Sequence, residues 1–280
     1  MRLGGPVFID SDDPAELARA HRALGYRVAF CPEVSLGDGG RIGAIREAFA
    51  EQDVVIAELG VWNNLMDPEE ARRRTNLEAM QKGLALAEEV GALCVVNIAG
   101  SFNRDNWAGP HPDNYSRKAF ELAVANARDI IDAVRPKRAK LTYEMMPFAI
   151  PDSADSYLRL MEAVDRPAFG VHLDVVNIIN GVDRYFNNAA VIKECFEKLG
   201  PHVVSCHLKD VRLGEELTVH LDEVIPGEGD FDIRSYLLEV HKLPHQPPVL
   251  LEHLKTKEEY EQAREHVLGL AREIGVDFEG

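Results

Sequence analysis

The sequence of 280 residues contains no hydrophobic run of the length that membrane proteins need. No stretch approaches the ~20 consecutive apolar residues of a membrane-spanning helix. The first residues lead into a short apolar run without the longer hydrophobic segment of a secretory signal peptide. We therefore expect a cytoplasmic protein that has no membrane partner.

Positive charge is also scarce. The chain has 31 Lys and Arg against 47 Asp and Glu, which gives a formal net charge of −16. Proteins that hold phosphodiester backbones need a basic surface, so we expect no nucleic-acid partner. A local basic pocket for one small anionic substrate stays open.

Cysteine is sparse and scattered. The 4 cysteines form no Cys-x-x-Cys pair, which excludes the usual spacing of zinc and dithiol sites. Cys31, Cys94 and Cys206 lie in or beside predicted strands and are expected to be buried, reduced thiols. A disulfide framework is not expected in a cytoplasmic chain of this length.

Short apolar runs alternate with longer amphipathic stretches along the whole chain, and hydrophobic residues make up 46% of it. Such runs predict strands and such stretches predict helices. The predicted strands are Pro6–Ile9, Arg27–Phe30, Asp53–Glu58, Leu93–Ile98, Lys140–Glu144, Ala168–Leu173, Val203–His207 and Pro248–Glu252. The predicted helices are Pro14–Leu24, Ile42–Ala50, Pro68–Val90, Asn114–Val134, Ser153–Val164, Asn188–Leu199, Ile233–His241 and Lys257–Ile274.

This order of elements predicts a closed parallel barrel. Strand signals that are each followed by a helix, repeated eight times, match the (β/α)8 or TIM barrel. An open, doubly wound sheet would usually carry a glycine-rich phosphate turn after its first strand, and Ile9–Asp13 has no glycine. We predict an α/β protein with a single barrel domain over residues 1–280.

The last four predicted strands end in side chains that can bind a metal ion. These residues are Glu144, Asp174, His207 and Glu252. Any one of them could instead cap the next helix or pair with a nearby Lys or Arg. Four in succession at the same end of a barrel converge on its axis, where three carboxylates would repel one another without a cation. Three carboxylates and one imidazole suit Mn²⁺, Mg²⁺ or Co²⁺.

The C-terminal half carries motifs of a known superfamily. The motifs are Tyr143–Met145, His172–Asp174, Cys206–Asp210, Pro226–Gly229 and Leu251–His253. In this order and spacing they make the chain resemble the sugar phosphate isomerase/epimerase superfamily, the xylose-isomerase-like barrels. That superfamily includes ketose 3-epimerases, hydroxypyruvate isomerase and inosose dehydratase.

The resemblance implies a ligand set and a chemistry. Glu144, Asp174, His207 and Glu252 would hold one divalent metal ion, with Mn²⁺ preferred and Mg²⁺, Co²⁺ or Zn²⁺ as alternatives. Glu144 and Glu252 would also exchange protons with the substrate. A metal ion on a carbonyl and its adjacent hydroxyl stabilises an enediolate. A homodimer or homotetramer is the assembly that the resemblance implies.

One position departs from the pattern of many members. They have a histidine three residues after the metal-binding aspartate, where this chain has Asn177. An amide can hydrogen-bond a substrate oxygen but cannot act as a general acid or base near neutral pH. We therefore predict a substrate-binding role for Asn177.

Loops after two earlier strands suggest contacts with a sugar. Trp62 is followed by Asn63 and Asn64, and an indole with neighbouring amides is typical of carbohydrate binding. Asn97 at the end of the fourth strand supports the same interpretation. The alternative is an ordinary loop with a buried Trp. We predict that Trp62 and Asn97 bind substrate.

Charged residues directly after His207 are further candidates. Lys209 could hold a substrate oxygen or a ligand carboxylate, and Asp210 could orient a metal ligand. A surface ion pair between Lys209 and Asp210 is an equal alternative. Arg212 is a weaker candidate for binding substrate.

The alternation of side chains along a strand predicts the directions in which two further histidines point. His172 lies two residues before Asp174, so both side chains face the barrel interior, where His172 could touch substrate or support a ligand. His253 alternates to the face opposite Glu252 and is expected to be structural.

A loop and a short alternating segment lie between the last two barrel strands. The glycines of Pro226–Gly229 permit unusual backbone angles, and Glu228 is expected to fix this loop. The alternation in Val219–Glu223 predicts a small strand or lid.

These interpretations predict a metal-dependent isomerase or epimerase for a small ketose, aldose or related polyol. A lyase on the same scaffold, either a dehydratase or a β-eliminase, is the alternative, because both reactions begin with proton abstraction next to a carbonyl. An abasic-site endonuclease of the same superfamily is disfavoured by the negative charge and the single histidine ligand. A sugar-binding protein without catalysis is disfavoured by the four retained ligands.

Overall fold

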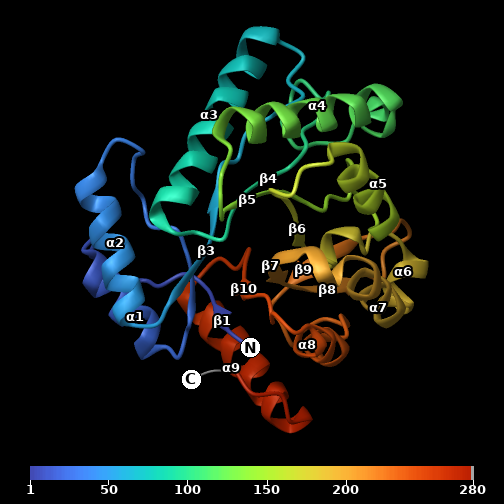
Figure 1. Cartoon of the computed structure of the whole chain (residues 1–280). Helices are drawn as coiled ribbons and strands as arrows, with labels where there is room; N and C mark the ends of the chain where they lie inside the picture. The colour runs from blue at the N-terminus through green and yellow to red at the C-terminus, as the bar shows by residue number, and fades with distance from the viewer. Residues whose placement is uncertain (279–280) are drawn as a thin grey trace.

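A closed barrel of eight parallel strands forms the centre of the computed structural model, which describes residues 1–278. Figure 1 shows the helices arranged around this barrel. The strands are, in order around the barrel, β1 (Leu3–Gly4), β2 (Val28–Phe30), β3 (Val55–Gly60), β4 (Cys94–Asn97), β5 (Lys140–Glu144), β6 (Phe169–Leu173), β7 (Val203–Leu208) and β10 (Val249–Leu251). Pairing of β10 with β1 closes the ring. The predicted TIM barrel is confirmed.

A helix follows each barrel strand and covers its outer side. These helices are α1 (Pro14–Ala23), α2 (Gly39–Glu51), α3 (Glu70–Val90), α4 (Arg117–Val134), α5 (Ala154–Val164), α7 (Asn188–Leu199), α8 (Ile233–Lys242) and α9 (Lys257–Ile274). Each overlaps a predicted helix, and α9 has the predicted ends. The predicted start of α4 at Asn114 was too early, because Ser116 caps the helix by accepting a hydrogen bond from the backbone N–H of Ala119.

The prediction of the first strand was wrong. Residues Pro6–Ile9 form no strand, and β1 lies earlier at Leu3–Gly4. Pro6 has no N–H to give to a strand ladder. Gly4 contacts the backbone of Val28 so closely that a Cβ atom would collide with it. The barrel closes at this glycine because the two backbones can approach there without a side chain between them.

The chain between β6 and β10 contains elements that the sequence only partly indicated. A short helix, α6 (Val182–Phe186), precedes α7 and was not predicted. Strands β8 (Asp210–Leu213) and β9 (Leu221–Val224) form an antiparallel hairpin. The strand or lid predicted at Val219–Glu223 therefore has a counterpart in β9.

Local signals explain where several helices begin and end. Thr256 accepts a hydrogen bond from the N–H of Glu259, whose carboxylate accepts one from the N–H of Lys255 at the start of α9. Gly91 and Gly275 end α3 and α9 in the left-handed conformation. The glycines stop these helices because they adopt positive φ without steric cost.

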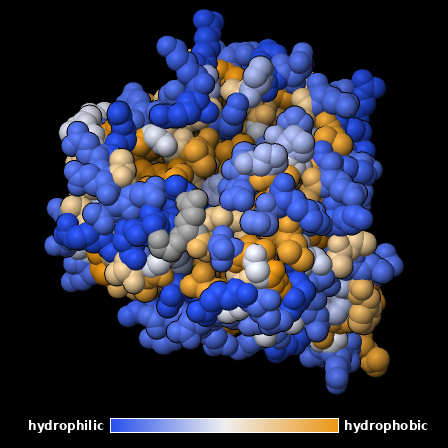
Figure 2. Space-filling view, turned by 60° about the horizontal axis from the view of Figure 1, so that its bottom comes forward, coloured by the Kyte–Doolittle hydropathy of each residue, from blue (hydrophilic) through white to orange (hydrophobic). Residues whose placement is uncertain are grey.

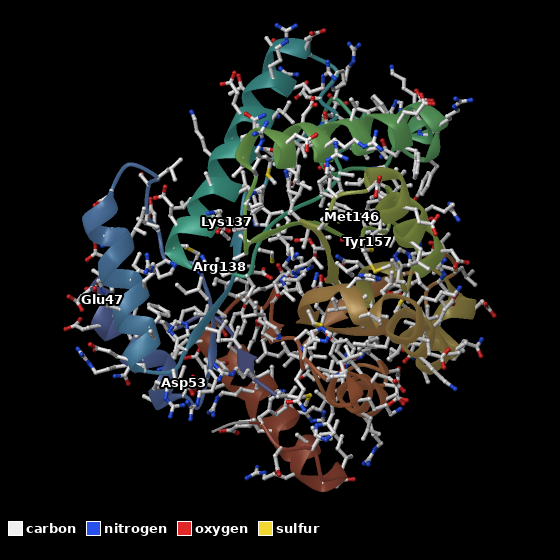
Figure 3. The ribbon with its side chains drawn as sticks, viewed as in Figure 1. Glu47, Asp53, Lys137, Arg138, Met146 and Tyr157 are labelled. Carbon is white, nitrogen blue, oxygen red and sulfur yellow. The ribbon has the colours of Figure 1, made fainter. Side chains whose placement is uncertain are left out.

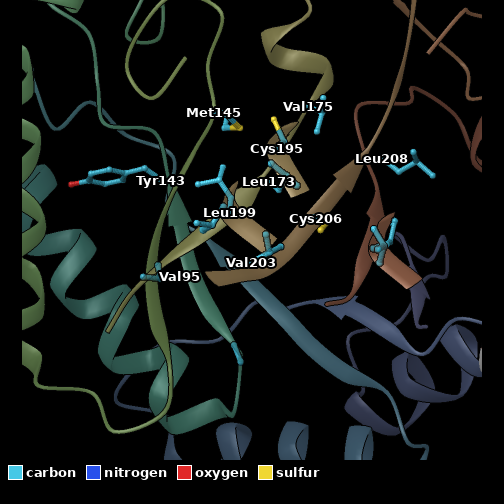
Figure 4. Packing of buried hydrophobic residues seen from close by; sticks show 14 of the residues in the cluster. Val95, Tyr143, Met145, Leu173, Val175, Cys195, Leu199, Val203, Cys206 and Leu208 are labelled. Carbon is cyan, nitrogen blue, oxygen red and sulfur yellow. The ribbon is translucent and has the colours of Figure 1, made fainter. Parts of the chain in front are cut away.

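The core lies between the strands and the helices. Residues that alternate with inward-facing positions point outward into this layer, among them Tyr143, Leu173 and Cys206, which are fully buried. Figure 4 shows part of the layer, with Leu173 of β6 and Cys195 of α7 labelled. All four cysteines are free thiols; Cys94 and Cys206 are buried as predicted, whereas Cys31 is only partly buried.

The outer surface is mainly polar. On the face drawn in Figure 2, hydrophilic residues cover most of the surface and hydrophobic residues gather in separate patches between them. Among the described residues, no helix combines the length and the apolar character needed to cross a membrane.

One buried tyrosine joins α5 to the strands that lead into the barrel mouth. Tyr157, labelled in Figure 3, has its hydroxyl 2.6 Å from the carbonyl oxygen of Tyr143 and 3.0 Å from that of Gly170. The backbone N–H groups of Tyr143 and His172 donate to the same hydroxyl at 3.3 and 3.2 Å. The side chain is fully buried, so no water can replace these contacts. Tyr157 thereby fixes the ends of β5 and β6 relative to each other.

Replacement of this hydroxyl should destabilise the fold. We expect Tyr157→Phe to lower the free energy of unfolding by about 1–3 kcal/mol, because buried backbone groups lose their partner. The matched control is Tyr115→Phe, since the half-exposed Tyr115 also donates to a backbone carbonyl, that of Pro147. Tyr115→Phe should lower the free energy of unfolding by no more than about 0.5 kcal/mol. Urea unfolding measures both, and equal stability of the two variants would contradict the role of Tyr157.

Candidate metal centre

The four predicted ligand residues meet at one end of the barrel. Glu144 is the last residue of β5 and His207 lies one residue before the end of β7. Asp174 and Glu252 directly follow β6 and β10. One ligand atom from each lies within 4.8 Å of all the others. The prediction that these strand ends converge is confirmed.

The imidazole of His207 lies at the centre of this cluster. Its Nδ1 atom is 2.9 Å from Glu252 Oε2, 3.2 Å from Glu144 Oε1 and 3.6 Å from Asp174 Oδ2. The side chain of Glu252 is 14% exposed, and the other three are buried. The cluster therefore opens towards solvent on the side of Glu252.

Lys209 brings a second cationic group to the same carboxylates. Its ammonium nitrogen lies 2.7 Å from Asp174 Oδ2 and 3.1 Å from Glu252 Oε2. It also donates to the amide oxygen of Asn177, whose amide nitrogen donates to Glu144 Oε1 at 3.1 Å. Lys209 is only 1% exposed, which excludes the surface ion pair considered from the sequence.

The two glutamates of the cluster have pKa values shifted in opposite directions. Burial raises the pKa of Glu144, and the nearby positive charges of His207 and Lys209 only partly offset this. Burial also raises the pKa of Glu252, but His207 and then Lys209 outweigh it and bring the pKa to about 2. The environment therefore favours the protonated form more at Glu144 than at Glu252.

The other ionisable groups complete the balance of charge. Burial raises the pKa of Asp174, yet Lys209 and His207 hold it well below its usual range. Burial lowers the pKa values of His207 and Lys209, but the surrounding carboxylates raise both well above their usual range. The cluster thus pairs buried anions with buried cations, as such groups require.

Glu58 is a member of this region that the sequence analysis did not identify. It lies within β3, is 1% exposed, and accepts a hydrogen bond from His207 Nε2 at 3.0 Å. His172 Nε2 and the hydroxyl of Ser205 contact its other oxygen at 2.9 and 2.8 Å. The available signal was a single carboxylate in the apolar run Val55–Leu59.

The structure places His172, for which a contact with substrate was predicted, beside His207. The ring is fully buried, lies against the ring of His207 with centroids 4.1 Å apart, and faces Glu58. This agrees with the other interpretation from the sequence, support of a ligand. Strand alternation identified its inward direction but not its depth in the barrel.

The expectation for His253 was wrong. Strand β10 ends at Leu251, so alternation no longer applies two residues later, and His253 has a positive φ of 62°. Its Nδ1 lies 3.0 Å from Glu223 Oε1 and 3.1 Å from Lys209 Nζ. His253 therefore borders the cluster instead of pointing away from it.

Asp210 holds a loop and does not orient a metal ligand. Its carboxylate is buried and accepts hydrogen bonds from the backbone N–H groups of Gly227, Gly229 and Phe231 at 2.9, 2.9 and 3.0 Å. The unusual backbone angle predicted for this loop is present at Gly227, with φ 102°. Asp210, more than Glu228, fixes the loop.

The remaining predicted substrate-binding residues lie in three different environments. Arg212 directs its guanidinium at the carbonyl oxygen of Glu228. Asn97 is fully buried, and its amide nitrogen donates to Asn63 Oδ1 at 2.9 Å, so it helps to shape the loop after β3. Trp62 is 45% exposed and available for contact.

A cavity of about 400 Å³ opens beside the cluster. Asn177 and Glu223 contribute polar groups to its wall, and Phe148, Val219 and Leu221 contribute apolar ones. Its size and mixed lining suit a small organic molecule.

The donor set fits a hard divalent cation. Asp174 Oδ2 and Glu252 Oε2 are buried oxygens that face cationic groups of the chain, Lys209 at 2.7 and 3.1 Å and His207 at 3.6 and 2.9 Å. Buried lone pairs of this kind are costly unless they face a cation. Three carboxylates and one imidazole nitrogen are ligands for Mn²⁺, Mg²⁺ or Co²⁺. Glu144, Asp174, His207 and Glu252 could therefore hold one such ion.

A comparison with family models now adds to the geometry. The model described as the xylose isomerase-like TIM barrel matches residues 16–270. The chain belongs to this family. No curated protein sequence matches the chain.

Solved structures of similar fold are distant in sequence. A 3-keto-D-glucoside 4-epimerase from E. coli is 14% identical with a TM-score of 0.72, over 97% of this chain and 99% of the other. The probable 3-DHS dehydratase AsbF from Bacillus anthracis is 13% identical with a TM-score of 0.70, over 96% and 98%. A xylose isomerase-like barrel protein from Mycobacterium smegmatis, in complex with magnesium, is 17% identical with a TM-score of 0.65, over 93% and 88%. These likenesses show a shared fold.

Metal binding at this cluster should compete with protons. His207 must release its Nδ1 proton to bind an ion, and its pKa is raised well above the usual value. Glu144 must also lose its proton to bind an ion, and its raised pKa likewise strengthens the competition from protons. The apparent affinity for Mn²⁺ should therefore fall as the pH is lowered, by about tenfold per pH unit for each proton displaced.

Calorimetric titration with Mn²⁺ at several pH values measures this dependence. The control His241→Asn, on the outer surface of α8, should keep the slope of the wild type. An affinity for Mn²⁺ that does not change with pH would contradict the prediction that protons compete with the ion.

Proposed function

We propose that the protein is a divalent-metal-dependent isomerase or epimerase that acts on a small sugar or related polyol. The observation that carries the proposal is the convergence of Glu144, Asp174, His207 and Glu252, with Lys209 among them, at the barrel mouth. In barrels of this kind, the loops after the strands build the active site. The 3-keto-D-glucoside 4-epimerase of the same fold supports the reaction class.

Glu144 and Glu252 are the proposed proton-transfer residues. Their pKa values are shifted in opposite directions, which suits one acid and one base. A divalent ion, when bound, would polarise a substrate carbonyl and its neighbouring hydroxyl and so lower the energy of an enediolate. One of these two carboxylates would take the proton next to the carbonyl, and the carboxylic acid formed at this pair would return a proton to the enediolate.

Substrate oxygens would be held by groups at the edge of the cluster. Lys209 Nζ and Asn177 Nδ2 already donate to the carboxylates and amide around them, and both lie beside the ligand residues. Asn177 also lines the cavity, so it can reach a molecule bound there. Trp62, half-exposed after β3, is proposed as a surface for one face of the sugar.

A lyase is the second candidate. The dehydratase among the structures of similar fold favours it. Proton abstraction by the same residues would begin the reaction, and the enediolate would then expel a neighbouring hydroxyl or alkoxy group instead of taking back a proton. The two reactions differ in which substrate oxygen faces an acid.

Incubation with Mn²⁺ and a panel of keto-sugars in D₂O tests the proposal. We expect deuterium at the carbon next to the carbonyl of the recovered sugar, followed by mass spectrometry and NMR. Loss of water or of a glycone would identify the lyase. No exchange and no elimination with any substrate of the panel would contradict both candidates.

Removal of either proposed proton-transfer group should suppress this exchange. We expect Glu144→Gln and Glu252→Gln each to lower the exchange rate by about 10²–10⁴-fold, with weaker Mn²⁺ binding as well. The control Glu121→Gln removes an exposed carboxylate on α4 and should exchange like the wild type. Wild-type exchange in either site variant would exclude that residue from proton transfer.

A further inference from the structure

Glu58 contacts the back of the imidazole whose front faces the ligand oxygens. One ring nitrogen of His207, Nδ1, faces Glu144, Asp174 and Glu252, and the other, Nε2, lies 3.0 Å from Glu58 Oε1. The chain thus places carboxylates on both sides of one ring. Glu58 itself lies two residues before the end of β3 and is not part of the group formed by the four candidate ligands.

We propose that Glu58 is a positioning residue, which keeps the Nε2 proton on His207 and so leaves Nδ1 free to bind the metal ion. The proposal rests on the proposed function only in taking the four-residue cluster as the metal site. It adds a residue of β3 to a site otherwise built from β5, β6, β7 and β10.

The hydrogen bonds around Glu58 fix the tautomers of both histidines. A carboxylate only accepts, so His172 Nε2, Ser205 Oγ and His207 Nε2 must all donate to it. His172 Nδ1 is buried and has no partner within residues 1–278. That atom is then a lone pair and not an N–H, which is the state expected when the proton of a neutral ring is on Nε2. The buried Nδ1 atom of His172 and the three groups that donate to Glu58 are consistent with the same tautomers, in which both histidines carry a proton on Nε2.

The same arrangement leaves His207 Nδ1 directed at the three carboxyl groups of the cluster, to which it donates while it carries its proton. Three carboxylate oxygens lie 2.9–3.6 Å from this atom. A lone pair there would be repelled unless a cation lies between nitrogen and oxygens. Once the Nδ1 proton is released, Glu58 keeps the remaining proton on Nε2, and the lone pair of Nδ1 faces the point that a cation would share with the carboxylate oxygens. Carboxylates that hold the outer nitrogen of a ligand histidine also make the ring a better donor.

Glu58, His172 and His207 also lie close enough together to be considered as a second metal site. Hydrogen bonds explain this group better. Each contact of Glu58 is 2.8–3.0 Å, which is a hydrogen-bond distance, and Ser205 takes part as a fourth member that is a poor metal ligand. His207 would also have to bind one ion through each ring nitrogen. We therefore assign Glu58 to the support of His207.

Two substitutions of Glu58 test its role, together with a control at Ser205. Glu58→Leu removes the acceptor, and Glu58→Gln keeps the size of the side chain but loses its charge. Ser205→Ala removes a partner of the same carboxylate without touching His207. We expect the affinity for Mn²⁺, measured by calorimetry, to fall by about 10–100-fold in Glu58→Leu and by about tenfold in Glu58→Gln. Ser205→Ala should bind Mn²⁺ like the wild type.

A spectroscopic readout separates positioning from packing. In protein loaded with diamagnetic Mg²⁺ or Zn²⁺, ¹⁵N–¹H NMR should show a slowly exchanging proton on Nε2 of His207 in the wild type and in Ser205→Ala. That proton should exchange rapidly in Glu58→Leu. A His207 ring without a proton on Nε2 in the wild type would overturn the proposal.

The affinities decide the remaining outcomes. Wild-type affinity for Mn²⁺ in a folded Glu58→Leu protein would overturn the proposal, as would an equal loss in Ser205→Ala. Should Glu58→Leu fail to fold, wild-type affinity in Glu58→Gln would overturn it instead. Neither readout needs turnover. A wild type that binds metal but exchanges no deuterium would contradict the proposed function and leave the role of Glu58 standing.

Discussion

Electrostatic repulsion among buried carboxylates is the constraint on which the site depends. Glu144, Asp174 and Glu252 meet where the barrel excludes most water, and in the described structure His207 and Lys209, with His253 beside Glu252, offset their charge. Such a group persists because the strands that carry it are fixed by pairing and by core packing on their outer sides. The barrel thus holds like charges together at a cost that a bound cation would lower.

Some residues take part in the proposed chemistry at this group of charges, and others hold the strands and loops that carry it. Opposed pKa shifts in Glu144 and Glu252 arise from their different exposure and from their distances to His207 and Lys209. Tyr157 and Asp210 act further out, since one fixes two strand ends and the other fixes the loop at Gly227. A small displacement of either support would change distances among the charged groups.

The sequence identified the site residues at the ends of the strands but not those that lie deeper in the barrel. Glu58 belongs to the site through a hydrogen bond across 149 residues, and it lies within β3 instead of at its end. A rule based on strand ends therefore could not find it. His253 was misplaced for a related reason, because alternation stops where β10 stops. In both cases the sequence did not show which side chains from distant strands lie at the same height along the barrel axis.

The sequence by itself determined the order of strands and helices, because hydrophobic period and capping signals act over a few residues. It also identified the four candidate ligands, since Glu144, Asp174, His207 and Glu252 each come at the end of an apolar run that the sequence shows. Tertiary structure decided that Glu58 contacts His207, that Lys209 is buried among carboxylates, and that β1 lies at Leu3–Gly4. These features depend on how the barrel closes and in which register, and closure is a property of all eight strands together.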